Sequence, residues 1–245
     1  MTLNLNAPAE ALYQCVKNLP IVSPHGHCDA SWFAKNTAFS NPAELLVTPD
    51  HYVFRLLYSN GISLADLGIG APGKHANPRE VFRIFAAHWH LFLGTPTRVW
   101  LDYVLRQTLQ ITAELSSETA NLIYDQIAER LTQDAFRPRA LFESFNIETL
   151  ATTDSALDDL CHHAAISASG WTGRVLPTFR PDGVLDPSDP NFQTNLQELE
   201  KITGIALDSY AGYLEALRVR RAFFIQMGAT ATDHAIEAIH TEWLY

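Results

Sequence analysis

Residues 19–27 read LPIVSPHGH, a short apolar run that ends in a His-x-His triplet. The apolar run predicts a strand, in which side chains two apart share one face at a spacing of about 6.5 to 7 Å. Both imidazoles of the triplet can therefore reach one metal ion, although a structural histidine pair is the alternative. Active sites of parallel α/β barrels form at the C-terminal ends of strands. We interpret His25 and His27 as candidate metal ligands at such a strand end.

The overall composition excludes two classes of partner. Seventeen Lys and Arg residues against 27 Asp and Glu residues give a formal charge of −10, which opposes attraction to nucleic acids and anionic lipids. The mean hydropathy is −0.04, and no apolar stretch approaches the ~18 residues expected of a membrane span. The 245 residues could form one large α/β domain or two smaller domains.

Two features predict a cytoplasmic protein. The segment from Met1 to Ala11 has neither the basic region nor the continuous apolar core of a secretory signal. Cys15, Cys28 and Cys161 are few, odd in number and widely spaced, which favours a reduced compartment over a disulfide framework.

The region from about residue 30 to 145 is predicted to be mostly helical. Asn41-Pro42 and Asn77-Pro78 each offer a cap residue followed by a proline at the first helical position. Another helix is expected from Thr48-Pro49 to Asn60-Gly61, and an amphipathic helix is expected after Ser117-Glu118.

Short apolar strands alternate with helices in the rest of the chain. Strands are expected at 147–153, 174–180 and 229–232, with helices from Ser155 to before Gly170 and from Ser209 to Met227. This alternation predicts a parallel α/β sheet. With the first strand there are about four strands, whereas a closed (β/α)8 barrel needs eight.

The predicted organisation is therefore a partial TIM-like barrel with a large helical insertion after its first strand. Residues 1–29 form an N-terminal segment and the first barrel strand, 30–145 the insertion, and 146–245 the βα units of the incomplete barrel, in a single domain overall. Residues 235–245 have helical character and apolar side chains.

A second candidate site lies where Pro49 opens a helix. Asp50, His51 and Tyr52 occupy its first turn, where free backbone N–H groups and the helix dipole favour an anionic ligand such as a sugar carboxylate. The alternative is an ordinary helix start, in which Asp50 balances the dipole and Tyr52 is half buried.

Arg180 and Asp233 each follow a predicted strand. A guanidinium at a strand end can bind a carboxylate bidentately, although a salt bridge to Asp182 or Asp154 is the alternative. Asp233 can hold a substrate hydroxyl or act as an acid or base, and its alternative is the N-cap of the last helix.

Two other histidine pairs are interpreted as ordinary packing or surface residues. His88 and His90 fall in an apolar helical stretch, where residues two apart diverge by about 200° and cannot chelate one ion. His162 and His163 are adjacent in a predicted helix and diverge as well.

Five stretches together resemble the uronate isomerases, a branch of the amidohydrolase superfamily. They are PIVSPHGH at 20–27, PDHY at 49–52, ATTD at 151–154, LPTFRPD at 176–182 and ATDH at 231–234. They appear in the order that the family has. The resemblance runs from about Leu19 to the end of the chain and covers the N-terminal half of a typical member.

The resemblance implies a distorted (β/α)8 barrel that interconverts D-glucuronate with D-fructuronate and D-galacturonate with D-tagaturonate. It implies that His25 and His27 bind a divalent metal, commonly zinc. The substrate-binding residues that it implies are His51, Tyr52, Arg180 and Asp233, of which Tyr52 and Asp233 are the candidate catalytic side chains.

The resemblance also implies proton transfer between C2 and C1 through an enediol. In the family, a metal-binding aspartate of the last barrel strand takes part, and no residue here matches it. The expected partners are a hexuronate and either a second copy of the chain or the C-terminal half. Two alternatives are a metal-dependent hydrolase of the same superfamily, because His-x-His serves both chemistries, and an inactive half-barrel that self-associates.

Overall fold

The computed structural model describes residues 6–70 and 76–235, which fall into two compact units. The first, called the barrel unit here, comprises Met1–Asn36 and Phe142–Tyr245, and the second, the helical unit, comprises Thr37–Leu141. Most of the C-terminal helix expected at 235–245 lies outside the described residues. Among the helices of the described residues, none is long and apolar enough to cross a membrane.

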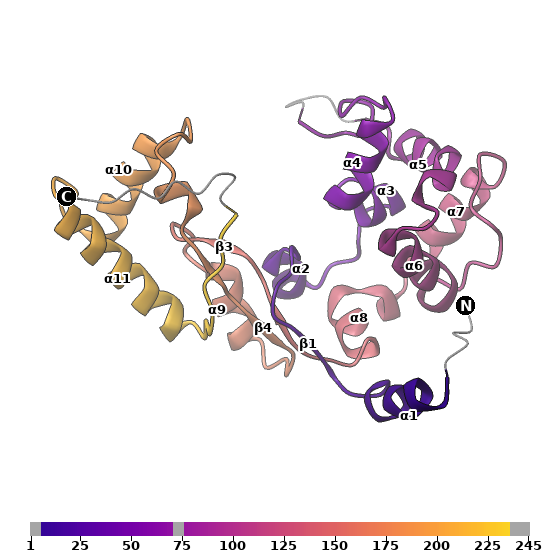
Figure 1. Ribbon diagram of the computed structural model, residues 1–245, viewed down its shortest axis with the longest axis horizontal. Helices are drawn as coiled ribbons and strands as arrows, with labels where there is room; N and C mark the ends of the chain where they lie inside the picture. The colour runs from indigo at the N-terminus through magenta and orange to yellow at the C-terminus, as the bar shows by residue number, and fades with distance from the viewer. Residues whose placement is uncertain (1–5, 71–75, 236–245) are drawn as a thin grey trace. The chain divides into compact units, whose positions relative to one another are not determined.

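The barrel unit is built on parallel strands (Figure 1). Strands β1 (Ile21–Ser23), β2 (Ile147–Ala151) and β4 (Arg174–Leu176) form a three-stranded sheet in the order β1-β2-β4. Strands β3 (Asp154–Ser155) and β5 (Phe179–Arg180) form a second parallel pair. In the chain β3 follows β2 and β5 follows β4, so the β3–β5 pair continues the β2–β4 pair in the same direction. This arrangement is expected of a partial parallel α/β barrel.

The strands expected at 147–153 and 174–180 are each divided in two. Hydrogen bonds nevertheless cross the break, because Thr152 N donates to Leu176 O at 3.0 Å and Asp154 N donates to Thr178 O at 3.1 Å. Thr178 N, the next donor on this side of the strand, donates instead to Oδ2 of the Asp154 side chain at 3.1 Å, which accounts for the division.

The fourth strand position is reduced to a single bridge. Thr232 pairs in parallel with Phe179, and Phe179 N donates to Ala231 O at 3.2 Å. The segment expected as a strand at 229–232 therefore occupies the next place in the sheet, although it is too short to count as a regular strand.

The barrel unit also contains helices. They are α1 (Ala7–Val16), α2 (Ala30–Lys35), α9 (Cys161–Ala168), α10 (Phe192–Thr203) and α11 (Tyr210–Gln226), with a 3-10 turn at Asp182–Val184. The helix expected from Ser155 begins only at Cys161, so that prediction is wrong at its start. Ser155 belongs to β3, and Leu160 has a left-handed φ of 54°, which a helix cannot include.

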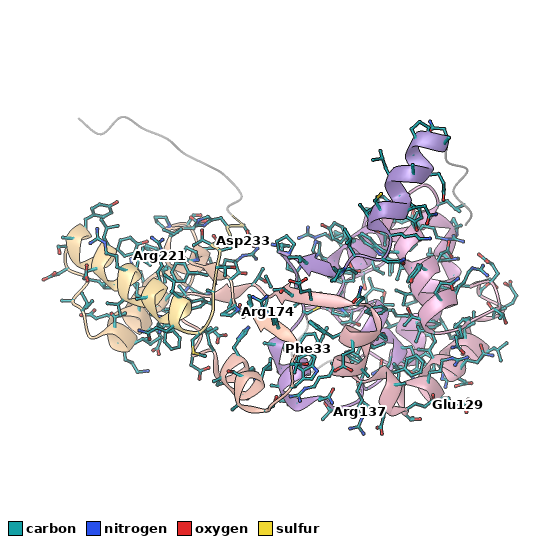
Figure 2. All side chains as sticks on the ribbon, turned by 90° about the horizontal axis from the view of Figure 1, so that it is seen from below. Phe33, Glu129, Arg137, Arg174, Arg221 and Asp233 are labelled. Carbon is teal, nitrogen blue, oxygen red and sulfur yellow. The ribbon has the colours of Figure 1, made fainter. Side chains whose placement is uncertain are left out.

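Two separate apolar clusters form the core of the barrel unit. One joins α2 and α9 to the sheet and consists of Ala30, Phe33, Phe142, Leu150, Ile166 and Val175. Phe33, labelled in Figure 2, stacks on Trp171 with ring centroids 5.9 Å apart. Because these residues pack in the barrel unit, the helical unit begins later and ends earlier in the chain than the insertion expected at 30–145. The second cluster packs α10 and α11 on Phe179 and consists of Ala156, Leu160, Phe179, Val184, Leu199, Ala216 and Phe224.

The helical unit consists of α3 (Pro42–Leu46), α4 (His51–Ser59), α5 (Pro78–Ala87), α6 (Pro96–Tyr103) and α7 (Ala120–Leu131), with short 3-10 or π turns at Trp89–Phe92, Val104–Thr108 and Asp134–Phe136. Helix α8 (Pro138–Ser144) joins it to the barrel unit. Asn41 and Asn77 cap α3 and α5 through their side chains, as predicted. One continuous cluster of buried residues extends from Ala43 to Phe136.

Candidate functional site

The two histidines of the His-x-His triplet face one another just beyond β1. Their Nε2 atoms lie 3.1 Å apart, and the two rings meet edge to face. A tetrahedral zinc ion with nitrogen ligands at about 2.0 to 2.1 Å places two donors about 3.3 Å apart. The arrangement of His25 and His27 therefore fits two positions around one divalent ion.

The glycine between the histidines lies close to the neighbouring strand. A Cβ atom built on Gly26 would lie 3.2 Å from the carbonyl oxygen of Ala151, the last residue of β2. Such a contact is tighter than an ordinary van der Waals contact and involves backbone, which does not move aside freely. Glycine at this position thus lets the end of β1 lie against the end of β2.

Asp233 connects His25 to Arg180. Its Oδ2 atom lies 2.8 Å from Nδ1 of His25 and 2.7 Å from an Nη atom of Arg180. A hydrogen on Nδ1 is placed to be donated to this carboxylate, and in that tautomer the lone pair of Nε2 faces Nε2 of His27, 3.1 Å away. A carboxylate behind a metal-binding histidine commonly fixes the ring and its tautomer in this way.

The electrostatic surroundings favour the charged form of Asp233. Burial acts to raise the pKa of its carboxyl group, but the hydrogen bond from Arg180, the backbone N–H of His234 and the charges of Arg180 and His25 outweigh it. The pKa of Asp233 therefore lies below its ordinary value, and the group is a carboxylate at neutral pH.

Arg180 keeps an unused donor. Its Nε atom is buried and has no hydrogen-bond partner among the described residues. Oδ2 of Asp182 lies 3.6 Å from this atom and accepts a hydrogen bond from the backbone N–H of Ala235 at 2.7 Å. The alternative of a salt bridge to Asp182 is therefore present, as an ion pair at 3.6 Å that is longer than the 2.7 Å contact with Asp233.

The described residues contain no group of three or more His, Cys, Asp or Glu side chains positioned to hold a metal ion. His25 and His27 thus offer two ligands, with Asp233 placed behind one of them rather than beside the same ion.

His51 and Tyr52 belong to the helical unit, within which the structure places them side by side. Asp50 caps α4 by accepting from Tyr52 N at 2.8 Å, and the rings of His51 and Tyr52 are 4.2 Å apart. Tyr52 is 58% exposed, more than the half-buried tyrosine of an ordinary helix start, and its ring lies edge to face with Trp100.

A buried polar network at the end of β2 was not predicted as functional. Thr152 Oγ1 lies 2.7 Å from Oδ2 of Asp154 and 2.9 Å from Nε2 of His163, and both Thr152 and His163 are buried. Asp154 also accepts from Thr178 N at 3.1 Å, which ties the network to the segment that precedes Arg180. The ATTD motif at residues 151–154 was the signal in the sequence for this network. The pair His162-His163 gave none, because its position in a helix does not indicate a hydrogen-bond partner.

Burial shifts both titratable groups of this network toward their neutral forms. Burial raises the pKa of Asp154, although hydrogen bonds from Thr152 and Thr178 and the charge of His163 act against it. Burial lowers the pKa of His163, although the charges of Asp154 and Asp158 act against it. The network adjoins a cavity of about 230 Å³ that His27 also lines.

Comparisons with known proteins all identify the same family. The family model described as glucuronate isomerase matches residues 2–243. A uronate isomerase of Rhizorhabdus wittichii is 56% identical over 226 residues, which cover 92% of this chain and 48% of that protein. A uronate isomerase of Sphingopyxis alaskensis is 54% identical over 230 residues, with the same coverage of both chains.

Solved structures agree. The crystal structure of glucuronate isomerase from Caulobacter crescentus superposes with a TM-score of 0.87 at 48% identity and covers 91% of this chain and 47% of its own. The uronate isomerase of Thermotoga maritima superposes with a TM-score of 0.85 at 28% identity and covers 96% of this chain and 51% of its own. The chain therefore spans about half the length of the relatives that it matches.

Proposed function

Because the chain belongs to the glucuronate isomerase family, we propose that it supplies one half of a uronate isomerase. The proposed reactions interconvert D-glucuronate with D-fructuronate and D-galacturonate with D-tagaturonate. The observation that carries this proposal is the position of Asp233, whose one carboxylate oxygen contacts both the imidazole of His25 and the guanidinium of Arg180. A metal-binding group and an anion-binding group are thereby joined in one cluster.

His25 and His27 are the proposed ligands of a divalent metal, with zinc as the first candidate. Their facing Nε2 atoms support this role, as does the hydrogen bond that orients His25. When bound, such an ion would polarise a sugar oxygen and stabilise the negative charge that develops there.

Arg180 is the proposed binding residue for the sugar carboxylate. Its guanidinium is fixed by Asp233, and its buried Nε atom still lacks an acceptor among the described residues. A carboxylate offers such an acceptor, and a charge-assisted hydrogen bond in this position would be strong. This preference for an acidic sugar favours the isomerase over a hydrolase that uses the same His-x-His pair.

Asp233 is the proposed acid–base group. As a carboxylate it can take the proton from C2 of the aldose and return it to C1 of the enediol. During the same steps O1 gains a hydroxyl proton and O2 loses one, which gives the ketose. His51 and Tyr52 stay proposed substrate-binding residues, and Tyr52 a proposed catalytic one, on the resemblance of the PDHY motif.

The test is a single polypeptide that joins this chain to the portion of the R. wittichii isomerase that the chain does not match. We expect the zinc-loaded fusion to convert D-glucuronate to D-fructuronate. Asp233→Asn should lower kcat by about 100-fold or more because a general base is lost. Asp66→Asn changes an exposed aspartate of the helical unit in the same way and should leave kcat unchanged.

A folded, zinc-loaded fusion without isomerase activity would contradict the proposal. Equal rates for the two aspartate variants would contradict the role of Asp233. Hydrolysis of an amide or ester substrate in place of isomerisation would favour the hydrolase alternative.

A further inference from the structure

Asp154 holds the backbone of Thr178 at two points. Its own N–H donates to Thr178 O at 3.1 Å, and Oδ2 of its carboxylate accepts from Thr178 N, also at 3.1 Å. A side chain thus supplies an acceptor at the break in the strand, where a regular parallel ladder uses a backbone carbonyl. Thr178 is 3% exposed, so water cannot readily replace the carboxylate as a partner of its N–H.

The carboxylate of Asp154 is itself fixed. Its Oδ2 atom lies 2.7 Å from Thr152 Oγ1, which lies 2.9 Å from Nε2 of His163. A hydroxyl has one hydrogen to donate, so when Thr152 donates it to Asp154, the hydrogen between Thr152 and His163 belongs to Nε2. His163 lies on α9, whose Ile166 packs against the sheet. The orientation of Asp154 therefore depends on this helix as well as on its own strand.

The segment that Asp154 holds leads directly to Arg180. Ala156 N donates to Arg180 O at 3.1 Å, which continues the ladder on the same side of the segment. On the other side, Phe179 O accepts from the backbone N–H of Asp233 at 3.1 Å, and Asp233 is labelled in Figure 2. The segment is therefore fixed between two neighbours, and a shift at its start would displace Arg180 relative to Asp233.

We propose that Asp154 is a positioning residue for Arg180. By holding Thr178, it sets the place of the guanidinium that binds the carboxylate of the uronate. This inference rests on the proposed function, and it gives a task to a carboxylate that lies outside the proposed substrate-binding residues. The accuracy of such a placement matters, because a misplacement of about 1 Å can lower a rate by about 100-fold.

The alternative is that the network of Thr152, Asp154 and His163 only stabilises the fold. A stabilising role would affect the barrel unit as a whole, whereas a positioning role acts through Arg180. The two roles are therefore separated by removing Asp154 from a protein that already lacks the guanidinium.

The experiment measures kcat/KM for D-glucuronate in the zinc-loaded fusion described above. Asp154→Ala should lower it by about 10- to 100-fold, because Thr178 N loses its acceptor. Asp154→Asn should stay within about threefold of the wild type, because its amide oxygen can still accept both hydrogen bonds. Asp189→Ala is the matched control and should leave kcat/KM unchanged. Asp189 lies in the same unit and likewise accepts from a backbone N–H, that of Asn191, at 2.7 Å.

A double-mutant cycle with Arg180→Gln decides between positioning and fold support. In the Arg180→Gln background, Asp154→Ala should change kcat/KM by less than about twofold, because its effect passes through the absent guanidinium. Equal losses in the two backgrounds would overturn the inference. Circular dichroism checks each fold, and Asp154→Ser replaces Asp154→Ala if the latter unfolds, because serine also lacks the carboxylate that reaches Thr178.

Hydrogen exchange in the full chain without its fusion partner gives a second readout that needs no activity. The amide of Thr178 should exchange slowly in the wild type and in Asp154→Asn, and faster in Asp154→Ala. Equally slow exchange in Asp154→Ala would contradict the hold on Thr178. An active wild-type fusion with wild-type kcat/KM in Asp154→Ala would contradict this inference alone, whereas an inactive wild-type fusion would contradict the proposed function and this inference with it.

Discussion

The helical unit and the barrel unit bury their apolar residues in different ways. In the helical unit, helices from α3 to α7 share one continuous cluster that extends from Ala43 to Phe136. In the barrel unit, the apolar residues form two separate clusters, and β1 remains exposed on both faces. The helical unit has no strand among its described residues, whereas the barrel unit carries the histidine pair, Arg180 and Asp233.

The largest effect is expected in the core of the helical unit. Phe85→Ala removes a fully buried ring that contacts three other aromatic rings, and it should lower the free energy of unfolding by about 3 to 5 kcal/mol. Val22→Ala in β1 should change the free energy of unfolding by less than about 0.5 kcal/mol, because the side chain is already exposed. Denaturant unfolding of the full chain measures both variants. Equal losses of unfolding free energy would contradict the difference in burial between the two units.

The second effect compares the His-x-His triplet at residues 25–27 of the barrel unit with the one at residues 88–90 of the helical unit. His25→Ala should weaken zinc binding by more than about 100-fold, since loss of a carboxylate behind the ligand alone costs about 10- to 100-fold. His90→Ala is the control, because the rings of His88 and His90 are stacked with centroids 6.2 Å apart and do not face one another edge on. Competition with a zinc chelator measures both, and unchanged affinity in His25→Ala would refute the site.

A smaller effect is expected in the buried network of the barrel unit. Thr152→Val keeps the shape of the side chain but leaves Asp154 and His163 without their shared hydroxyl, at a cost of about 1 to 3 kcal/mol in unfolding free energy. Thr132→Val is the matched control on the surface of the helical unit and should cost less than about 0.5 kcal/mol. A loss no larger than that of the control would show that the network does not support the fold.

The smallest effect is a pH dependence that belongs to the same network. The pKa of His163 is lowered in the folded chain, so below about pH 6.5 the unfolded chain takes up the proton first and stability falls. The raised pKa of Asp154 acts in the opposite direction, because the folded chain then binds that proton first. Thermal unfolding from pH 7.5 downward should show a shallower initial decline in His163→Gln than in the wild type. Parallel curves would contradict the neutral state of His163.

Local sequence signals predicted the helical unit and the strand-end motif. Asn-Pro pairs start α3 and α5, because the asparagine accepts a backbone hydrogen bond and proline suits the first helical position. The triplet at residues 25–27 was predicted to bring two imidazoles together, and their Nε2 atoms lie 3.1 Å apart. Both signals act within a few residues of the chain.

The strand-end positions of His25, Arg180 and Asp233 predicted that these residues lie near one another, but the patterns could not predict which side chains are in contact. Nothing near Asp233 indicates that its carboxylate would orient His25, because the two residues meet only when the sheet forms. The late start of α9 depends on β3 pairing with β5 and on the left-handed backbone of Leu160, which periodicity does not reveal. The tertiary hydrogen bonds of His163 were missed for the same reason.

Gly26 has a consequence for the proposed metal site. An alanine there would fit only if the end of β1 moved away from Ala151 by a few tenths of an ångström. The two imidazoles flank this residue, so the same displacement would change the separation of their donor atoms. Ions differ in the donor separation that they prefer, because their ligand distances and coordination geometries differ. The hydrogen atom of Gly26, in place of a methyl group, therefore helps to fix the donor separation of the proposed metal site.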